Sequence, residues 1–306
     1  MTPTRRAQLL LLAVVALWGT TFVIVKDALR DASPFVFNLL RMAIATLALL
    51  LFHRESLRNL PRATLLKGAA VGFFLAFGYQ LQTLGLAHTT AAKSGLLTGL
   101  VVIFVPVLTI VPALRPAGTG RPGPFTLLGA ALAFTGLILL TTPTGTSFTQ
   151  IFSTISFGDL LTLACAVAFA GHLLCLSLAS RSLPPDAGLL ATLQIGAATV
   201  VMLLTLPLEP GHHLTISPRL VVALLLTSLL ATAAAFTIQS YAQQHLPPTQ
   251  TAILLTLEPV FAWVTSLLIL HETMGSRAIT GAVLILAGIV VIELLGHSAQ
   301  TTEIPA

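Results

Sequence analysis

The sequence predicts an all-α membrane protein of about ten transmembrane helices, built as two inverted five-helix repeats. Of its 306 residues, 56% are apolar and only 8% are charged, whereas a soluble domain carries roughly 25% charged residues. The mean hydropathy is +0.96, and apolar runs of about 20 residues, the length that crosses a bilayer, follow one another along the chain. The second half of the chain also repeats part of the first.

Polar residues, prolines and glycines divide the chain into segments that are each long enough for one transmembrane helix. The connections between them are short, so no separate soluble domain is expected. The expected spans are residues 8–26, 35–53, 64–86, 94–114, 125–142, 158–178, 187–207, 218–241, 250–270 and 276–295.

Lysine and arginine are distributed unevenly over the connections, and this bias indicates orientation. The connections on the side of the N-terminus hold Arg5, Arg6, Arg54, Arg58, Arg62, Lys67, Arg115, Arg121 and Arg181, whereas those on the opposite side hold Lys26, Arg30, Lys93, Arg219 and Arg277. We therefore expect a multi-pass protein of the cell membrane (the cytoplasmic membrane in a bacterium) with both termini in the cytoplasm. The basic residues form no dense patch, so no nucleic-acid partner is expected despite a net charge of +5.

The first two spans carry a tryptophan and a deeply placed arginine. The first follows Arg5 and Arg6 and runs on past Trp18 without a small-x-small cleavage site, so it is expected to remain uncleaved. The second contains Arg41 about two turns from its start. Arg41 either extends to the interface or pairs with a carboxylate such as Asp27 or with an anionic group of a substrate.

The third and fourth spans combine small residues with polar ones. Each has a GxxxG pair, which predicts close approach of a neighbouring helix. The pairs are Gly68/Gly72 and Gly95/Gly99. Polar side chains at i, i+3 or i, i+4 share a face and either bond across helices or line a site. These residues are Tyr79, Gln82, Ser94 and Thr98.

The sixth span begins at Asp159, which is expected to cap the helix. Cys165 and Cys175 lie about 15 Å apart along it, too far for a disulfide, and are expected to pack as small apolar residues. His172, midway along the span, is either a hydrogen-bonded packing residue or a residue that faces a cavity.

The ninth span places Glu258 and Pro259 inside the apolar segment TLEPVFAW. An ionised carboxylate at the centre of a membrane helix costs about 2.5–3.5 kcal/mol. Glu258 is therefore either a neutral packing residue or a group that is reversibly protonated or contacts a substrate. Pro259 leaves the carbonyl of Leu255 without its helical donor, so we expect a bend toward a wet cavity. Trp18 and Trp263 lie away from span ends and either wall a cavity or pack.

The two halves of the chain are similar in sequence. Residues 78–108 align without gaps to residues 235–265 at an offset of 157, which matches Gln82 with Gln239 and His88 with His245. Near the start of each half, an offset of 151 matches Thr21 with His172. Because the repeat unit has an odd number of spans, the second copy is expected to insert upside down, with a site at the interface of the repeats.

These motifs together resemble those of the drug/metabolite transporter superfamily, in particular EamA-type permeases. The motifs are WGTTFVIVK (18–26), FNLLR (37–41), QTLGLAHTTAAKSGLLTGLVVIFVP (82–106), GDLL (158–161), LEPVFA (257–262), HE (271–272) and GAVLILAG (281–288). The resemblance implies two five-helix repeats, residues 1–145 and 155–296. It also implies an exporter of amino acids, metabolites or drugs that alternates access around a cavity lined mainly by helices 1, 3, 4, 6, 8 and 9. Phe169 stands where many relatives have tryptophan.

The function expected from these features is secondary-active transport of a small molecule by a monomer or homodimer. Protons are the candidate coupling ion. The expected substrate-binding residues are Trp18, Thr21, Tyr79, Gln82, Ser94, Thr98, His172, Gln239, Glu258 and Trp263. The alternatives are a gradient-independent channel or facilitator and a membrane scaffold subunit. An enzyme is not expected, because HETMG (271–275) lacks the second histidine of a zinc protease helix. No G-x-x-x-x-G-K-[ST] loop is present, and no cofactor or metal is expected.

Overall fold

A computed structural model describes residues 2–58, 60–111, 123–141, 155–182, 186–246, 254–255, 257–291 and 295. Within these ranges the regular structure is helical, and the only extended pairing is an isolated bridge between Ala32 and Leu214. The all-α class predicted from the sequence is confirmed for this part of the chain.

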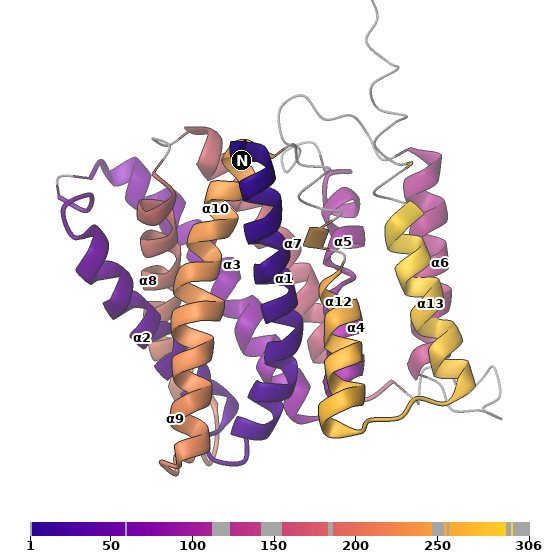
Figure 1. The fold of residues 1–306 in the computed structure, drawn as a ribbon. Helices are drawn as coiled ribbons and strands as arrows, with labels where there is room; N and C mark the ends of the chain where they lie inside the picture. The colour runs from indigo at the N-terminus through magenta and orange to yellow at the C-terminus, as the bar shows by residue number, and fades with distance from the viewer. Residues whose placement is uncertain are drawn as a thin grey trace, which may run out of the picture.

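The helices follow one another along the chain with short connections (Figure 1). They are α1 (Pro3–Ala28), α2 (Pro34–His53), α3 (Arg62–Ala87), α4 (Ala91–Thr98), α5 (Val101–Leu108), α6 (Pro124–Thr141), α7 (Phe157–Ser182), α8 (Ala187–Thr205), the 3-10 turn η3 (Leu206–Leu208), α9 (Pro218–Leu225), the π-helical η4 (Leu226–Ala234), α10 (Ala235–His245), α12 (Glu258–Thr265), the π-helical η5 (Ser266–Leu270) and α13 (Ser276–Val291).

Several of these helices begin at residues that satisfy their free backbone N–H groups. Thr2 accepts from Arg5 N before α1, Thr90 accepts from Lys93 N before α4, and Asp186 accepts from Leu189 N before α8. α7 begins with a capping box. Ser156 N donates to Asp159 Oδ2 (3.0 Å), and Asp159 N donates to Ser156 Oγ (3.1 Å). The capping role expected for Asp159 is confirmed.

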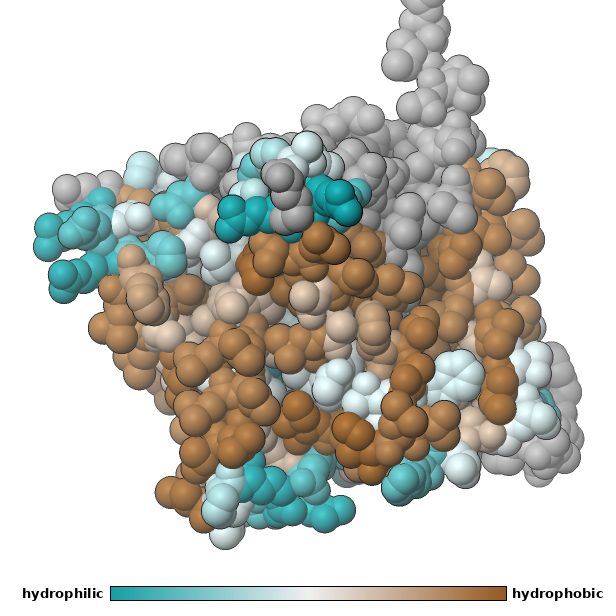
Figure 2. All heavy atoms as spheres, in the orientation of Figure 1, coloured by the Kyte–Doolittle hydropathy of each residue, from teal (hydrophilic) through white to brown (hydrophobic). Residues whose placement is uncertain are grey.

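The described helices are long and apolar enough for a polytopic membrane protein. Six continuous helical segments have the length and hydropathy of membrane spans, and four shorter apolar helices accompany them. Figure 2 shows hydrophobic residues across the middle of the visible face, with hydrophilic residues gathered toward its two ends. Large apolar side chains are exposed on the described helices, for example Phe52 at 83% and Leu204 at 73%. Such a surface suits contact with lipid rather than water.

Contacts at one end of the molecule show that the two halves run in opposite directions. Lys26, near the end of α1, donates to the carbonyl of Thr89, and the hydroxyl of Thr89 donates to Asp159 at the start of α7. The end of the first helix of one half therefore lies beside the start of the first helix of the other. This arrangement is the inverted repeat that the odd number of spans predicts.

Corresponding helices of the two halves pack against each other. α2 packs on α8, α4 on α12, and α6 on α13, and this last pair stands side by side at one edge of the bundle (Figure 1). The GxxxG pairs allow close contacts of α3 with α8 and of α4 with α12. A Cβ atom on Gly72 of α3 would lie 2.3 Å from the carbonyl oxygen of Gln194 in α8, and one on Gly99 would lie 2.3 Å from Pro259 Cγ. The close helix approach expected at these glycines is confirmed.

Three expected spans differ in detail from the structure. The fourth is divided at Gly99–Leu100 into α4 and α5, and its expected end at 112–114 lies outside the described residues. The eighth contains the nine-residue π-helical segment η4. The ninth was expected to bend at Pro259 inside a continuous helix, whereas α12 begins at Glu258. Pro259 thus stands in the first turn of α12, where no intrahelical N–H bond is required.

At the end of the bundle opposite the N-terminus, the α1–α2 connection is bonded to the connection before α9. Arg219 Nη2 lies 2.7 Å from Asp31 Oδ1, and Arg219 Nε donates to Asp31 Oδ2 at 2.9 Å. Ser217 Oγ donates to the same carboxylate at 2.6 Å. The Arg219 guanidinium and the Ser217 hydroxyl lower the pKa of Asp31 from its ordinary value. This bidentate pair joins the two halves of the chain.

Candidate functional site

A cavity lies between the two halves of the bundle and encloses about 670 Å³ of space between atoms, its mouth included. Its walls come from α1, α3, α4, α5, α7, α10 and α12, together with Leu255. The lining residues are Trp18, Thr21, Phe22, Tyr79, Gln82, Thr98, Gly99, Val101, Phe169, His172, Leu173, Phe236, Gln239, Leu255 and Glu258.

The lining residues of one half correspond to those of the other half at the offsets of the internal repeat. At an offset of 151, Trp18, Thr21 and Phe22 correspond to Phe169, His172 and Leu173. At an offset of 157, Tyr79, Gln82, Thr98 and Val101 correspond to Phe236, Gln239, Leu255 and Glu258. The remaining lining residue, Gly99, corresponds to Thr256, which lies outside the described residues. Each half therefore contributes the same set of positions, as expected for a site on a pseudo-twofold axis.

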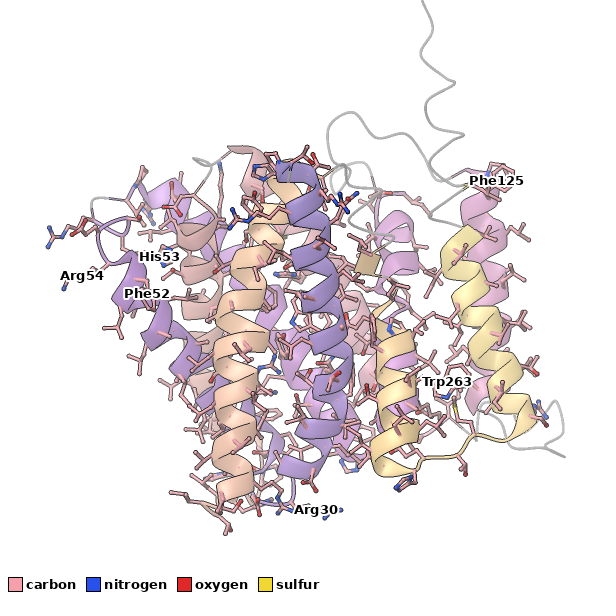
Figure 3. The ribbon with its side chains drawn as sticks, in the orientation of Figure 1. Arg30, Phe52, His53, Arg54, Phe125 and Trp263 are labelled. Atoms are coloured by element: carbon pink, nitrogen blue, oxygen red, sulfur yellow. The ribbon has the colours of Figure 1, made fainter. Side chains whose placement is uncertain are left out.

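Most of the residues expected from the sequence to bind a substrate lie in this lining. They are Trp18, Thr21, Tyr79, Gln82, Thr98, His172, Gln239 and Glu258. Ser94 and Trp263 lie outside it. Ser94 is fully buried one turn below Thr98, and Trp263 is five residues beyond Glu258, about 140° around the helix. Figure 3 shows Trp263 on the side of α12 that faces α13.

Three further aromatic residues of the lining, Phe22, Phe169 and Phe236, were not among the substrate-binding residues expected from the sequence. Phe22 is one helical turn beyond Trp18, and Phe236 is the repeat counterpart of Tyr79. Applying the repeat offsets to every candidate residue would have identified Phe236. Phe169 was noted only because relatives have tryptophan there, although it is the counterpart of Trp18.

Aromatic rings form much of the cavity wall. The ring centroids of Tyr79 and Phe169 are 5.4 Å apart in an edge-to-face arrangement at 90°. Those of Trp18 and Phe236 are also 5.4 Å apart, and those of His172 and Phe236 are 5.8 Å apart. The first two contacts join helices of opposite halves, the third joins two helices of the second half, and together they give the cavity rigid apolar walls.

Arg41 is buried behind this wall. It is 2% exposed, and its Nε donates to Thr232 Oγ1 at 2.8 Å. Its Nη2 donates to the Tyr79 hydroxyl at 3.1 Å and to the Ala231 carbonyl at 3.3 Å. Its Cζ lies 4.3 Å from the centroid of the Tyr79 ring. A guanidinium with charge-assisted bonds and a cation–π contact is stabilised at this depth without reaching the interface.

The alternative pairing of Arg41 with Asp27 is wrong. Asp27 Oδ1 lies 3.3 Å from Arg30 Nη1 and 3.6 Å from Arg219 Nη1, at the end of α1. The ion pairs of the described residues do not include Arg41. Arg41 points into the bundle because Tyr79 and the η4 backbone offer acceptors there, whereas Asp27 remains with the basic residues at the bundle end.

The π-helical segment η4 supplies acceptors to the cavity wall. Ala235 N donates to the carbonyl of Leu230, five residues back. The Ala231 carbonyl accepts from Trp18 Nε1 at 2.9 Å as well as from Arg41. Inside an ordinary α-helix this carbonyl would be occupied by the N–H four residues on. The widened helix therefore fixes the positions of Trp18 and Arg41.

The polar residues of the cavity differ in whether their side chains have hydrogen-bond partners. His172 Nε2 and Gln194 Oε1 are 2.8 Å apart, and Gln82 Nε2 donates to Thr98 Oγ1 at 3.4 Å. Gln239 is only 3% exposed, and its Oε1 has no hydrogen-bond partner among the described residues. Among those residues, no hydrogen bond or ion pair to the Glu258 carboxylate is found either, although Glu258 borders the cavity.

Comparison with known proteins places the whole bundle in one group. The sequence model of the EamA-like transporter family matches residues 5–142 and 156–294. An uncharacterised transporter of Archaeoglobus fulgidus is 31% identical over 286 residues, which cover 92% of this chain and 84% of the relative. A chloroplastic WAT1-related protein of Arabidopsis thaliana is 26% identical, covering 90% of this chain and 66% of that protein.

The fold also has a counterpart among solved structures. A crystal structure with 19% sequence identity matches 97% of this chain and 99% of its own with a TM-score of 0.64. At this level of identity the match concerns the fold alone.

Proposed function

We propose that this chain, which belongs to the EamA-like transporter family, is a secondary-active carrier that exports a small molecule by alternating access. The chain is a membrane transporter of the drug/metabolite type, and the cavity described above is its proposed substrate site. Residues 1–145 and 155–296 are the two repeats that would move against each other.

The observation that carries this proposal is the paired lining of the cavity. In an inverted repeat, exchanging the conformations of the two halves converts a cavity that opens toward one membrane face into one that opens toward the other. Such an exchange keeps a bound molecule among equivalent positions only if both halves contribute the same positions. Tyr79 with Phe236 and Gln82 with Gln239 meet this requirement.

Polar contacts at the bundle end opposite the N-terminus support a closed gate on that side. Lys26 Nζ donates to the Leu86 carbonyl at 2.7 Å and to the Thr89 carbonyl at 2.5 Å. Lys93 Nζ lies 2.7 Å from Asp159 Oδ2. These bonds hold the α3–α4 corner against α1 and α7.

Helix α12 is fastened to the same corner through Glu272. Its carboxylate accepts from Ala91 N at 3.2 Å and from Ala92 N at 3.1 Å. The free N–H groups at the start of α4 thus receive a charged acceptor from the other half of the chain. Opening toward this side would require all of these bonds to separate together.

Glu258 is the proposed coupling group. Among the described residues it is the one carboxylate in the cavity lining, and an access-dependent change in hydration would change the cost of ionising it. Glu258→Gln keeps the shape of the side chain and removes the titration. We expect the variant to insert normally and to lose the pH dependence of uphill export from proteoliposomes. An unchanged pH response would refute proton coupling through this residue.

The proposed substrate contacts are tested with the glutamine pair. Gln82→Leu and Gln239→Leu should each reduce transport while the amount of membrane-inserted protein stays close to wild type. Equal losses of inserted protein and transport would make these residues structural. Saturation and counterflow across the proteoliposome membrane distinguish a carrier from a channel or facilitator, which shows neither.

A further inference from the structure

We propose that the cavity selects molecules that carry a protonated amine on an apolar body of about one ring, with the ammonium group bound by Gln239 and Glu258. This inference rests on the proposed transport function and names the substrate class of the same cavity. Three features of the lining lead to it: an unpartnered amide oxygen, an unpartnered carboxylate, and the aromatic walls between which they lie.

The first feature is the difference between Gln82 and Gln239. In the first half, Gln82 bonds to Thr98 at 3.4 Å. The repeat counterpart of Thr98 is Leu255, which has no polar atom in its side chain. Gln239 therefore has no counterpart of the Thr98 hydroxyl to donate to, and, separately, its Oε1 is buried without a hydrogen-bond donor among the described residues. Leaving such a buried acceptor unsatisfied is costly, and a donor on a ligand would remove this cost.

The second feature is the charge that breaks the symmetry of the cavity. Glu258 corresponds to Val101, so the carboxylate is present in one half only. In the sequence it lies three residues beyond Leu255, the counterpart of the residue that Gln82 bonds. Gln239 and Glu258 line the same cavity, and the proposed ammonium site joins them as one polar corner. Both offer acceptors, and no hydrogen bond or ion pair among the described residues supplies a donor to Gln239 Oε1 or to the Glu258 carboxylate.

A protonated primary amine fits this corner. It carries a positive charge to compensate Glu258 and three N–H donors, enough for the carboxylate and the amide together. A carboxylate or phosphate on the ligand would instead be repelled by Glu258 and would leave Gln239 Oε1 unsatisfied. A neutral hydroxyl has one donor and no charge.

The aromatic walls account for the rest of the molecule. Trp18, Tyr79, Phe169 and Phe236 surround the space between the halves. Ring faces attract cations and pack well on flat apolar groups. The buried charge of Arg41 is directed onto the Tyr79 ring and the Ala231 carbonyl, and Arg41 is not part of the lining. The cavity therefore suits a flat or compact apolar body with a cationic end.

The test compares three ligands that share one ring and differ in their polar group: 2-phenylethylamine, 2-phenylethanol and 3-phenylpropionate. Their dissociation constants are measured by titration calorimetry at neutral pH on the full chain in lipid nanodiscs. We expect the amine to bind at least tenfold more tightly than the alcohol, and the carboxylate to bind most weakly. Glu258→Gln should reduce the preference for the amine over the alcohol to less than threefold.

Two further variants complete the experiment. Gln239→Leu should weaken amine binding several-fold and leave alcohol binding nearly unchanged. Glu55→Gln, a matched change at an exposed glutamate between α2 and α3, should keep the full preference. Equal or tighter binding of the alcohol or the carboxylate by the wild-type protein overturns the proposal, as does an unchanged preference in Glu258→Gln. If Glu258→Gln does not fold, the ratio of the amine and alcohol dissociation constants of the wild-type protein and the effect of Gln239→Leu still test the proposal.

The outcome is separable from that of the transport proposal. Saturable counterflow of any labelled solute without amine preference would keep the carrier and reject the substrate class. Amine preference in nanodiscs without counterflow of amine in proteoliposomes would keep the binding site and reject the carrier.

Discussion

Replacing Gly72 with alanine should destabilise the bundle by separating α3 from α8. The added Cβ would lie 2.3 Å from the Gln194 carbonyl oxygen and 2.6 Å from Ala197 Cβ. Both distances are about 1 Å or more short of an ordinary van der Waals contact. The first neighbour is backbone and cannot rotate away, so the two helices themselves must move.

The magnitude follows from a comparison with Gly196→Ala on α8. A Cβ there would have Thr46 Cγ2 as its nearest neighbour, at 3.8 Å, so it fits. Both substitutions gain up to about 1 kcal/mol of helix propensity. Only Gly72→Ala adds the cost of overpacking, roughly 1–3 kcal/mol. We therefore expect Gly196→Ala to be at least as stable as wild type, and Gly72→Ala to be less stable than Gly196→Ala by about that cost.

The assay is heating of the detergent-solubilised proteins, followed by size-exclusion chromatography of the monodisperse fraction. With roughly 2–4 °C per kcal/mol for chains of 150–250 residues, the Tm values of the two variants should differ by about 2–12 °C. Equal Tm values for the two alanine variants would refute the close α3–α8 contact.

Three further predictions concern the ends of the bundle. The pKa of Asp31 is lowered in the folded state, so its ion pair with Arg219 stabilises the protein above the unfolded pKa and is lost as the pH falls through the folded pKa. Asp31→Asn should therefore flatten the acid limb of a curve of Tm against pH between about pH 5 and 3. An unchanged acid limb would contradict this. Asp159→Ala should lower stability by roughly 2–4 kcal/mol, because it breaks the pair with Lys93 and the cap on α7, and a Tm equal to wild type would show that neither contact contributes. A cysteine at the exposed His213, in a background without Cys165 and Cys175, should react with an impermeant thiol reagent in intact cells; reaction only after permeabilisation would reverse the proposed orientation.

Much of the architecture could be predicted before any contact was known. The shortage of charge required a lipid-facing surface, and the spacing of polar residues located the spans. The glycine pairs predicted the tight contacts of α3 and α4. The repeat offsets linked Gln82 to Gln239 and Thr21 to His172, and all four line the cavity.

The sequence was less informative where a residue depends on a distant partner. Arg41 has its partners at Tyr79, Ala231 and Thr232, separated by up to 191 residues along the chain. Nothing in the order of residues shows that Ala231 would have a carbonyl available, since this depends on the π-helical turn of η4. Trp263 was a reasonable candidate by residue type, but its direction depends on where α12 begins.

Sequence alone therefore determined that lipid surrounds this protein, where its spans lie and that its two halves repeat. These properties follow from residue chemistry and from the spacing of residues along the chain. Tertiary structure alone decided which polar groups are satisfied. Gln82 and Gln239 are equivalent in the sequence, yet among the described residues Gln82 donates to Thr98, whereas Gln239 Oε1 has no hydrogen-bond partner. A hydrogen bond requires atoms within about 3 Å, and only the packing of helices from both halves brings such groups to that distance.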